Sequence, residues 1–574
     1  MAKSAAAMII DTLIAAGVKR VYGLPGDSLN GLTEAIRRSG KVEWVHVRHE
    51  EEAAFAAGAE AHITGSLAVC AGSCGPGNLH LINGLYDCHR SRVPVLAIAA
   101  QVPSNELGGA YFQETRPEQL FRDCSHYAEM VGDPNQVPRL LGIAMRTAIA
   151  RRGVSVLVAP GDVLLGDCSE PMHPLAISEL SPLVHPIAED TQRAAEMLNG
   201  AGKVTILAGA GCAGAHAELI SLAERLQAPV VHALRGKEFI EYDNPYDVGM
   251  TGLLGFSSGY YAMMSCDVLL MLGTDFPYQQ FFPRDAKIIQ VDVRGEQIGR
   301  RTKVDLGLIG SVKETIADLL PLLKGKREAN HLKRSVDHYR RARQQLDSLA
   351  VADDGRSPMH PQYVAKMVND LADDDAVFTC DVGTPTIWAA RYLRMNGKRR
   401  LIGSFTHGSM ANALPQAAGA QAVDRNRQVI ALAGDGGVAM LLGGLLTLHQ
   451  MNLPAKIVIF NNASLAFVEM EMKAVGLLDY GTELKNPDFA RLAEAAGIFG
   501  VKIEKPEDLE SGLRTALQHK GPAVIDVPVH RQELSMPPHI DVSQMAGFAM
   551  YLAKAVLNGR GDEIIDLAHT ELFR

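Results

Sequence analysis

The sequence predicts an α/β protein with three doubly wound, parallel-sheet domains followed by a C-terminal helical tail. The length of 574 residues is too great for one core, since a domain takes about 100–200 residues. Short runs rich in Val, Ile and Ala alternate with helical patterns, which is typical of parallel sheets covered on both faces. Segments containing Pro interrupt this alternation twice. After residue 530 only a helical pattern remains.

The first domain is expected over residues 1–180. Asp11 and Lys19 interrupt its apolar start, and the apolar positions recur at helical spacing. This predicts an amphipathic first helix, although the segment superficially resembles a signal peptide. The strands expected after it are KRVYGLPG, SLAVCAG, PVLAIAA and VSVLVAPGDV. Residues 169–186 form the expected linker.

The second domain is expected over residues 187–345. Its strands are VTILAGA, APVVHAL, CDVLLMLG and KIIQVDV, with a long charged helical segment after them. A second linker is expected over 346–360.

The third domain is expected over residues 355–530. It repeats the alternation with AVFTCDVG, QVIALAGDGG, AKIVIFNN and PAVIDVPV. The tail, 531–574, begins with a break at Pro537 and Pro538.

Composition excludes several classes of protein. With 47% hydrophobic and 21% charged residues, the chain is an ordinary globular protein. The net charge of −9 argues against a nucleic-acid partner, which needs a basic footprint. No apolar run reaches the roughly 18 uncharged residues of a membrane span. The eight cysteines are scattered without a C-x-x-C pair, so we expect most of them to be buried thiols in a reducing compartment.

A metal–diphosphate site is predicted in the third domain. Gly434-Asp435-Gly436-Gly437 follows one strand, and Asn461-Asn462 follows the next. Open α/β sheets bind ligands at this end of their strands. The side-chain oxygens of Asp435 and Asn462 suit Mg²⁺, and the glycines let backbone amides approach phosphate closely. The alternative is a pair of ordinary strand-to-helix turns.

These two motifs resemble the signature of thiamine-diphosphate enzymes. The resemblance implies that Asp435 and Asn462 hold Mg²⁺, with the backbone carbonyl of Ser464 as a third ligand. Met410 matches the bulky residue that holds the cofactor bent, although a core methionine is the alternative. The thiamine-diphosphate contacts implied in this way are Gly408, Ser409, Met410, Asp435, Gly436, Gly437, Asn462, Ser464, Leu465, Ala466, Phe467 and Val468.

The catalytic acid is expected in the first domain. Thiamine chemistry needs a carboxyl group near the pyrimidine ring, in an apolar interface that favours its protonated form. Glu50 stands at the family's position before an Ala-rich helix. Glu51 and Glu52 are expected to be solvated residues of the helix N-terminus, where carboxylates suit the helix dipole. The loop Gly75-Pro76-Gly77 resembles the family loop that faces the cofactor.

A dinucleotide is predicted across the middle domain. Gly209 to Gly214 forms a formal G-x-G-x-x-G, but the acid expected about 20 residues later is missing, so this is not the usual NAD fingerprint. Asp292 ends the last predicted strand and could accept ribose hydroxyls. The strand ends resemble the FAD-binding version of thiamine enzymes, with a vestigial, empty site as the alternative. The expected FAD contacts are Gly211, His232, Arg235, Thr251, Gly252, Leu253, Leu254, Thr274, Asp275, Phe276, Pro277, Tyr278 and Asp292.

Over nearly the whole chain the sequence resembles the quinone-dependent pyruvate dehydrogenases, also called pyruvate oxidases. The resemblance implies oxidative decarboxylation of pyruvate to acetate and CO₂, with electrons passed through FAD to a membrane quinone. It places Phe467 between thiamine and flavin, Phe112 in the pyruvate pocket and Glu471 at a further active-site position. The alternatives are a carboligase of the acetolactate synthase type, an oxygen-using oxidase and a non-catalytic scaffold.

The tail and the assembly are also predicted. Met545, Phe548, Leu552, Ala555 and Val556 form one helical face. The resemblance implies that the tail binds lipid, which would place a cytoplasmic protein on the inner face of the cell membrane. The charge of the last residues would not attract anionic lipid, and a helix docked on its own protein is the alternative. A homo-oligomer, expected to be a tetramer, is implied because the resembling enzymes form each active site from two subunits.

Overall fold

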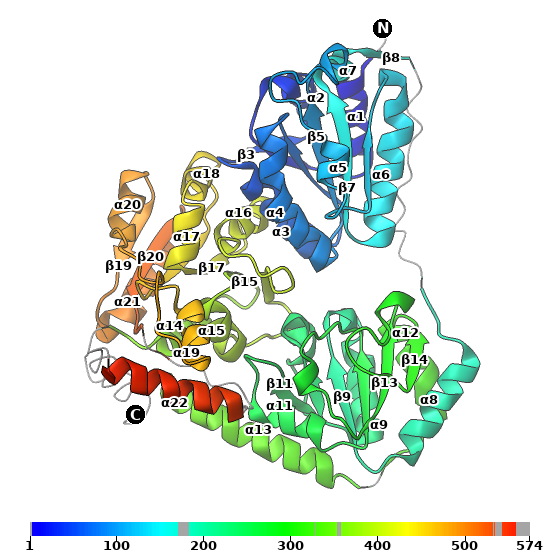
Figure 1. The fold of residues 1–574 in the computed structure, drawn as a ribbon, viewed down its shortest axis with the longest axis vertical. Coiled ribbons are helices and arrows are strands. Elements are labelled where there is room, and N and C mark those ends of the chain that lie inside the picture. The colour runs from blue at the N-terminus through cyan, green and yellow to red at the C-terminus, as the bar shows by residue number, and fades with distance from the viewer. Residues whose placement is uncertain are drawn as a thin grey trace.

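Three six-stranded parallel sheets make up the architecture of the chain (Figure 1). The computed structural model describes residues 3–169, 183–326, 328–352, 358–531, 533 and 542–557. The predicted fold class, three doubly wound α/β domains followed by a helix, is confirmed.

The first domain is built on a sheet of order β3-β2-β4-β5-β7-β6. Its first helix covers Ala5–Ala15, as predicted. The strands are β2 (Arg20–Gly23), β3 (Glu43–His46), β4 (Ala68–Gly72), β5 (Val95–Gln101), β6 (Tyr127–Met130) and β7 (Val154–Pro160). The helices are α1 (Ala5–Ala15), α2 (Asn30–Ser39), α3 (Glu50–Thr64), α4 (Pro76–Ser91), α5 (Pro117–Leu120), α6 (Val137–Arg151) and α7 (Gly161–Leu165). A small antiparallel pair joins β1 (Lys3–Ser4) and β8 (Asp167–Cys168).

The middle domain has the sheet order β11-β10-β9-β12-β13-β14. Asp292 ends β13, but it does not end the last strand as predicted, because β14 follows it. The strands are β9 (Val204–Ala208), β10 (Val230–His232), β11 (Asp247–Met250), β12 (Val268–Leu272), β13 (Lys287–Asp292) and β14 (Leu306–Ile309). The helices are α8 (Ala188–Gly200), α9 (His216–Leu226), α10 (Lys237–Ile240), α11 (Ser257–Met264), α12 (Val312–Leu319) and α13 (Asn330–Leu349).

The third domain has the sheet order β16-β15-β17-β18-β20-β19. The strands are β15 (Val377–Cys380), β16 (Arg400–Gly403), β17 (Val429–Gly434), β18 (Lys456–Asn461), β19 (Phe499–Lys502) and β20 (Ala523–Pro528). The helices are α14 (Pro361–Leu371), α15 (Thr384–Tyr392), α16 (Ala413–Val423), α17 (Asp435–Met440), α18 (Gly444–Gln450), α19 (Ala466–Ala474), α20 (Phe489–Ala495) and α21 (Pro506–Gln518).

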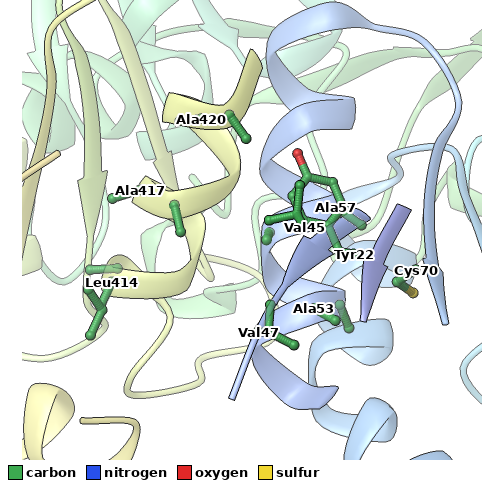
Figure 2. Packing of buried hydrophobic residues seen from close by; sticks show 14 of the residues in the cluster. Tyr22, Val45, Val47, Ala53, Ala57, Cys70, Leu414, Ala417 and Ala420 are labelled. Carbon is green, nitrogen blue, oxygen red and sulfur yellow. The ribbon is translucent and has the colours of Figure 1, made fainter. Parts of the chain in front are cut away.

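Helices α3 and α16 join the first and third domains by close backbone contact. A Cβ added to Gly419 on α16 would stand 2.6 Å from Ala56 Cα on α3, so only glycine allows this approach. Alanines from both helices and the strand residue Tyr22 share one buried cluster. Figure 2 shows the α16 residues Leu414, Ala417 and Ala420 beside this part of the first domain. The interface fixes the position of α3, the helix that begins with Glu50.

The described helix of the tail is α22 (Val542–Leu557), which packs against α19. The Tyr551 ring is buried, and Lys473 Nζ lies 5.2 Å from its centre. Lys554 Nζ donates to the carbonyl of Gly476 at 2.7 Å. In the described part of the tail, the helix is therefore docked on its own protein. Residues 558–574, and the side chains of Met545 and Val556 on the predicted apolar face, lie outside the described residues.

Two further predictions concern membranes and cysteines. None of the helices in the described ranges is long and apolar enough to cross a bilayer. All eight cysteines are free and buried, as expected from their scattered positions.

Candidate cofactor sites

The two motifs of the predicted metal site meet at one sheet edge. Strands β17 and β18 are neighbours, with Gly434 paired to Phe460, so Asp435 and Asn462 leave the sheet side by side. Both side chains are buried. Asp435 Oδ1 accepts from the amide of Gly436 at 2.9 Å, and Oδ2 accepts from the amide of Ala463 at 2.7 Å. The Asp435 carboxylate therefore links the two loops.

The donor set suits a hard cation. Burial raises the pKa of Asp435, although several hydrogen bonds act in the opposite direction. A divalent ion beside the carboxylate would offset this cost of burial. Asn462 and the backbone of Ser464 add neutral oxygens, the ligand type that Mg²⁺ prefers. In the part of the chain that the structure describes, no group of three or more His, Cys, Asp or Glu side chains is arranged so that it could hold a metal ion. The Asp435 loop thus fits Mg²⁺ through one carboxylate with neutral oxygens.

Two residues that support this site are not predicted from the sequence. Asn486 Nδ2 donates to Asp435 Oδ2 at 2.7 Å and to Asn461 Oδ1 at 2.9 Å. Asp381, after β15, accepts from the amides of Ala413 (2.9 Å) and Gly434 (3.2 Å). Burial raises the pKa of Asp381 to about 6. The signal for Asp381 was an acid directly after a predicted strand, whereas Asn486 lies in an irregular segment without a motif.

The glycines after Asp435 are required by their neighbours. A Cβ at Gly436 would stand 2.8 Å from Leu465 Cδ2 and 3.4 Å from Met410 Cε. A Cβ at Gly437 would collide with the carboxylate of Asp381. Met410 therefore lies against the predicted diphosphate loop, and the glycine backbone is bare enough for phosphate to approach.

Glu50 is buried at the start of α3. Its Oε2 lies 2.9 Å from His80 Nδ1, and the His80 ring stacks on His49 with centroids 4.2 Å apart. A Cβ on Gly77 would stand 2.9 Å from Glu50 Oε1. The predicted acid thus adjoins the Gly75-Pro76-Gly77 loop. His80 was not predicted, because nothing in the linear sequence pairs it with Glu50.

The prediction that Glu51 and Glu52 are solvated is wrong. Glu52 Oε2 accepts from the amide of Arg48 and from Thr447 Oγ1, both at 3.2 Å. The Glu52 side chain is buried, which raises its pKa to about 7. Glu51 is half-buried and accepts from Asn83 Nδ2 at 2.7 Å. The physical reason is that the N-terminus of α3 faces the third domain instead of water.

Asn83 connects the first domain to the predicted cofactor loop. Its Nδ2 also donates to Ser409 Oγ at 2.9 Å, and its Oδ1 lies 2.8 Å from His407 Nε2. Ser409 in turn precedes Met410, and the adjacent Gly408 has a φ of +85°. Within one chain, α4 therefore contacts the loop that is predicted to hold thiamine diphosphate, and Glu51 of α3 bonds the same Asn83.

The carboxyl edge of the middle sheet contains a bare backbone surface. A Cβ on Gly211 would stand 2.6 Å from Gly273 Cα, so the turns after β9 and β12 touch. Burial lowers the pKa of His232 to about 4, which keeps the ring neutral. Two buried polar atoms at this edge, His232 Nδ1 and Thr251 Oγ1, have no hydrogen-bond partner among the described residues. A ligand with polar atoms would satisfy them, so this edge fits a dinucleotide.

Charged residues from two domains meet at the same edge. Arg301 Nε lies 3.0 Å from Asp275 Oδ1, and Arg92, from the first domain, lies 3.6 Å from Asp275 Oδ2. Burial raises the pKa of Asp292. The backbone amide of Arg294 donates to Asp292 at 3.0 Å. Arg92 was not predicted, because its contacts come from packing between domains.

The middle domain also contacts the predicted thiamine site. Arg235 NH2 donates to the carbonyl of Ser91 at 2.7 Å, and its NH1 donates to Thr406 Oγ1 at 3.3 Å. Burial, together with the nearby Glu471 carboxylate, raises the pKa of Tyr278. Tyr278 therefore lies close enough to α19, the helix that carries Glu471, to be affected by the charge of that residue.

The remaining predicted residues lie around these contacts. A Cβ added to Gly252 would stand 3.0 Å from Phe276 Cε2. Leu254 packs against the core of the third domain. Phe467 is partly buried on α19 against that same core. Phe112 is 79% exposed, and its place in a pyruvate pocket remains a prediction. Other predicted positions at these edges are Leu253, Thr274, Pro277, Leu465, Ala466 and Val468.

Comparison with known proteins identifies all three domains. Protein-family models of thiamine pyrophosphate enzymes match the chain: the N-terminal TPP binding domain at residues 3–120, the central domain at 191–319 and the C-terminal TPP binding domain at 381–527.

Three relatives align with nearly the whole chain. A putative thiamine pyrophosphate-containing protein, YdaP, from Bacillus subtilis (strain 168) is 36% identical over 96% of this chain and 96% of its own length. Pyruvate oxidase from Lactiplantibacillus plantarum is 30% identical over 92% of this chain and 88% of its own. Acetolactate synthase from Arthrospira platensis is 30% identical over 94% and 97%.

Proposed function

Because the chain belongs to the thiamine pyrophosphate enzyme family, we propose that it oxidatively decarboxylates pyruvate and passes the electrons through FAD to a membrane quinone. Pyruvate, water and quinone give acetate, CO₂ and quinol, so two electrons leave the substrate and water supplies an oxygen of acetate. The observation that carries this proposal is the contact between the dinucleotide-type edge of the middle domain and the loop before Met410, made by Arg235 and Thr406.

The third domain would bind thiamine diphosphate. Asp435, Asn462 and the Ser464 carbonyl would hold Mg²⁺ against the diphosphate, while Met410 would support the bent cofactor. When bound, the cofactor supplies a nucleophilic carbon and an electron sink for decarboxylation. The bare backbone at Gly436 and Gly437 would let the phosphate approach closely.

Glu50 would act on the pyrimidine ring. It is buried, as a carboxyl that must hold and return a proton should be. His80, 2.9 Å away, offers a route for that proton toward solvent, because its side chain is 43% exposed. Hydrogen bonds between Asn83 and the 407–410 loop would hold the first domain against the third around this position.

The middle domain would bind FAD. The Gly211–Gly273 contact allows the dinucleotide backbone to lie close, and Asp292 would accept ribose hydroxyls. Thr251 and His232 would use their unsatisfied atoms on the same ligand. Phe467, Glu471 and Phe112 would complete the substrate pocket, with Phe467 toward the flavin.

Assembly and location complete the proposal. The chain would work as a homotetramer in the cytoplasm, on the inner face of the cell membrane. The tail would supply the lipid contact, and the described helix α22 is the part docked on α19.

Acetolactate formation is the second candidate, supported by the relative of that name with the same 30% identity and similar coverage. One assay separates the two reactions. Purified protein is given thiamine diphosphate, Mg²⁺, FAD and pyruvate, with ferricyanide or a soluble quinone as acceptor. Acetate formed in step with acceptor reduction supports our proposal. Acetolactate as the main product, or peroxide in place of reduced acceptor, would refute it.

A further inference from the structure

A buried carboxylate lies directly behind the metal loop. Glu469 is in the first turn of α19 and is 2% exposed. Its Oε2 accepts from Ser464 Oγ at 2.6 Å and from Arg531 Nε at 3.1 Å. Its Oε1 accepts from Lys473 Nζ at 2.6 Å. Both oxygens are therefore fixed by partners from three separate segments.

Two bases surround this carboxylate. Lys473 Nζ lies 2.6 Å from Glu469 Oε1, and Arg531 Nε lies 3.1 Å from Oε2. Arg531 also lies 3.5 Å from Asp479, so two acids face two bases. A buried ion pair with good geometry holds its groups firmly, and loss of one member is costly.

Ser464 is held at both its amide and its hydroxyl. The Ser464 amide donates to Asn462 Oδ1 at 3.2 Å, and the next amide, of Leu465, donates to the carbonyl of Thr482 at 2.8 Å. The hydroxyl is bound by Glu469. These contacts set the plane of the Ser464 peptide and the direction of the Asn462 side chain. They therefore fix the Ser464 carbonyl oxygen and Asn462 Oδ1, the two oxygens expected at the metal.

We propose that Glu469 is the positioning residue of the metal–diphosphate loop. Through Ser464 Oγ it fixes the loop from Asn462 to Ser464 in the conformation that coordinates Mg²⁺. This rests on the proposed function, since the loop must bind Mg²⁺ for Glu469 to act on it. Partners behind the ligands of a metal orient those ligands, and their loss typically weakens metal affinity roughly 10–100-fold.

The test measures Mg²⁺ binding directly. The full chain is freed of cofactor, saturated with thiamine diphosphate and titrated with Mg²⁺ by calorimetry. We expect Glu469→Gln to weaken Mg²⁺ affinity roughly 10–100-fold. The control is Glu510→Gln on α21, which breaks another i,i+4 ion pair, that with Arg514 (2.7 Å), outside the site. That variant should bind Mg²⁺ like the wild type.

A double-mutant cycle tests whether Glu469 acts through Ser464. Ser464→Ala removes the hydroxyl but keeps the backbone carbonyl. If both changes break the same contact, the double variant should bind Mg²⁺ about as weakly as Glu469→Gln alone. A purely structural salt bridge would instead give independent effects that add.

The outcomes are distinguishable. Wild-type Mg²⁺ affinity in Glu469→Gln, or additive effects in the cycle, would overturn the positioning role. If Glu469→Gln does not fold, Ser464→Ala decides alone, and unchanged affinity in that variant would overturn the proposal. A wild-type protein that binds no thiamine diphosphate with Mg²⁺ would refute the proposed metal site, and the positioning role with it.

Discussion

Replacing Gly419 by Ala tests whether the α3–α16 contact positions Glu50, the proposed catalytic acid. The added Cβ would stand 2.6 Å from Ala56 Cα, whereas carbon atoms pack at about 3.5–4.0 Å. The two helices must therefore move apart by roughly 1 Å. Such a shift displaces α3, which begins with Glu50. A misplacement of about 1 Å can reduce turnover about 100-fold, and overpacking costs about 1–3 kcal/mol of stability.

The assay compares turnover with pyruvate and the thermal midpoint of Gly419→Ala with those of the wild type. Helix propensity alone would make Ala more stable than Gly by about 1 kcal/mol, so any loss must come from the steric clash. Gly200→Ala, at the end of α8 where a Cβ meets nothing within 4 Å, is the control and should leave turnover unchanged without lowering the thermal midpoint. Turnover of Gly419→Ala within twofold of the wild type would show that α3 does not need this contact.

Three other predictions follow from the sites. The pKa of Glu52 is raised from 4.5 to about 7, so between these pH values the folded state keeps a proton that the unfolded state has lost. The free energy of unfolding of the wild type should therefore fall by up to about 3 kcal/mol as pH rises from 4.5 to 7. Glu52→Gln should flatten that loss in denaturant titrations, and parallel pH profiles would contradict it. Mg²⁺ and thiamine diphosphate at 100 times Kd should stabilise the wild type by about 2.7 kcal/mol, seen as a rise in its thermal midpoint. Asp435→Asn should abolish that rise, and an unchanged rise would remove Asp435 from the site. Gly211→Ala, with its Cβ 2.6 Å from Gly273 Cα, should release flavin from the purified protein, measured by fluorescence; full retention would argue against a dinucleotide at this edge.

The sequence predicts the inner strands of each sheet but not the edges. In the three six-stranded sheets the missed strands are β3, β6, β11, β14, β16 and β19, the two outermost strands of each. Each is only four residues long. Several of them are partly exposed, so they lack the continuous apolar run that reveals a strand buried on both faces. Inner strands such as β5, with seven buried residues, give a clear signal.

The candidate sites were predictable where one motif follows one strand. Asp435 and Asn462 belong to this class, because adjacency of their strands brings the motifs together. Glu469, Asn486 and Arg92 were missed, since their roles depend on partners from other segments. Glu52 was assigned to solvent because its helix position is typical of exposed acids, and only the packing of the third domain buries it.

The contacts of Arg235 affect how electrons could travel. Its guanidinium belongs to the middle domain, yet it bonds a backbone carbonyl of the first domain and a hydroxyl of the third. A swing of the middle domain would break both bonds and leave a buried cation without them. These two bonds therefore oppose movement of the middle domain relative to the other two domains. Electron flow between the two proposed cofactors would then cross one fixed gap, with a rate set by its width and by the side chains that fill it.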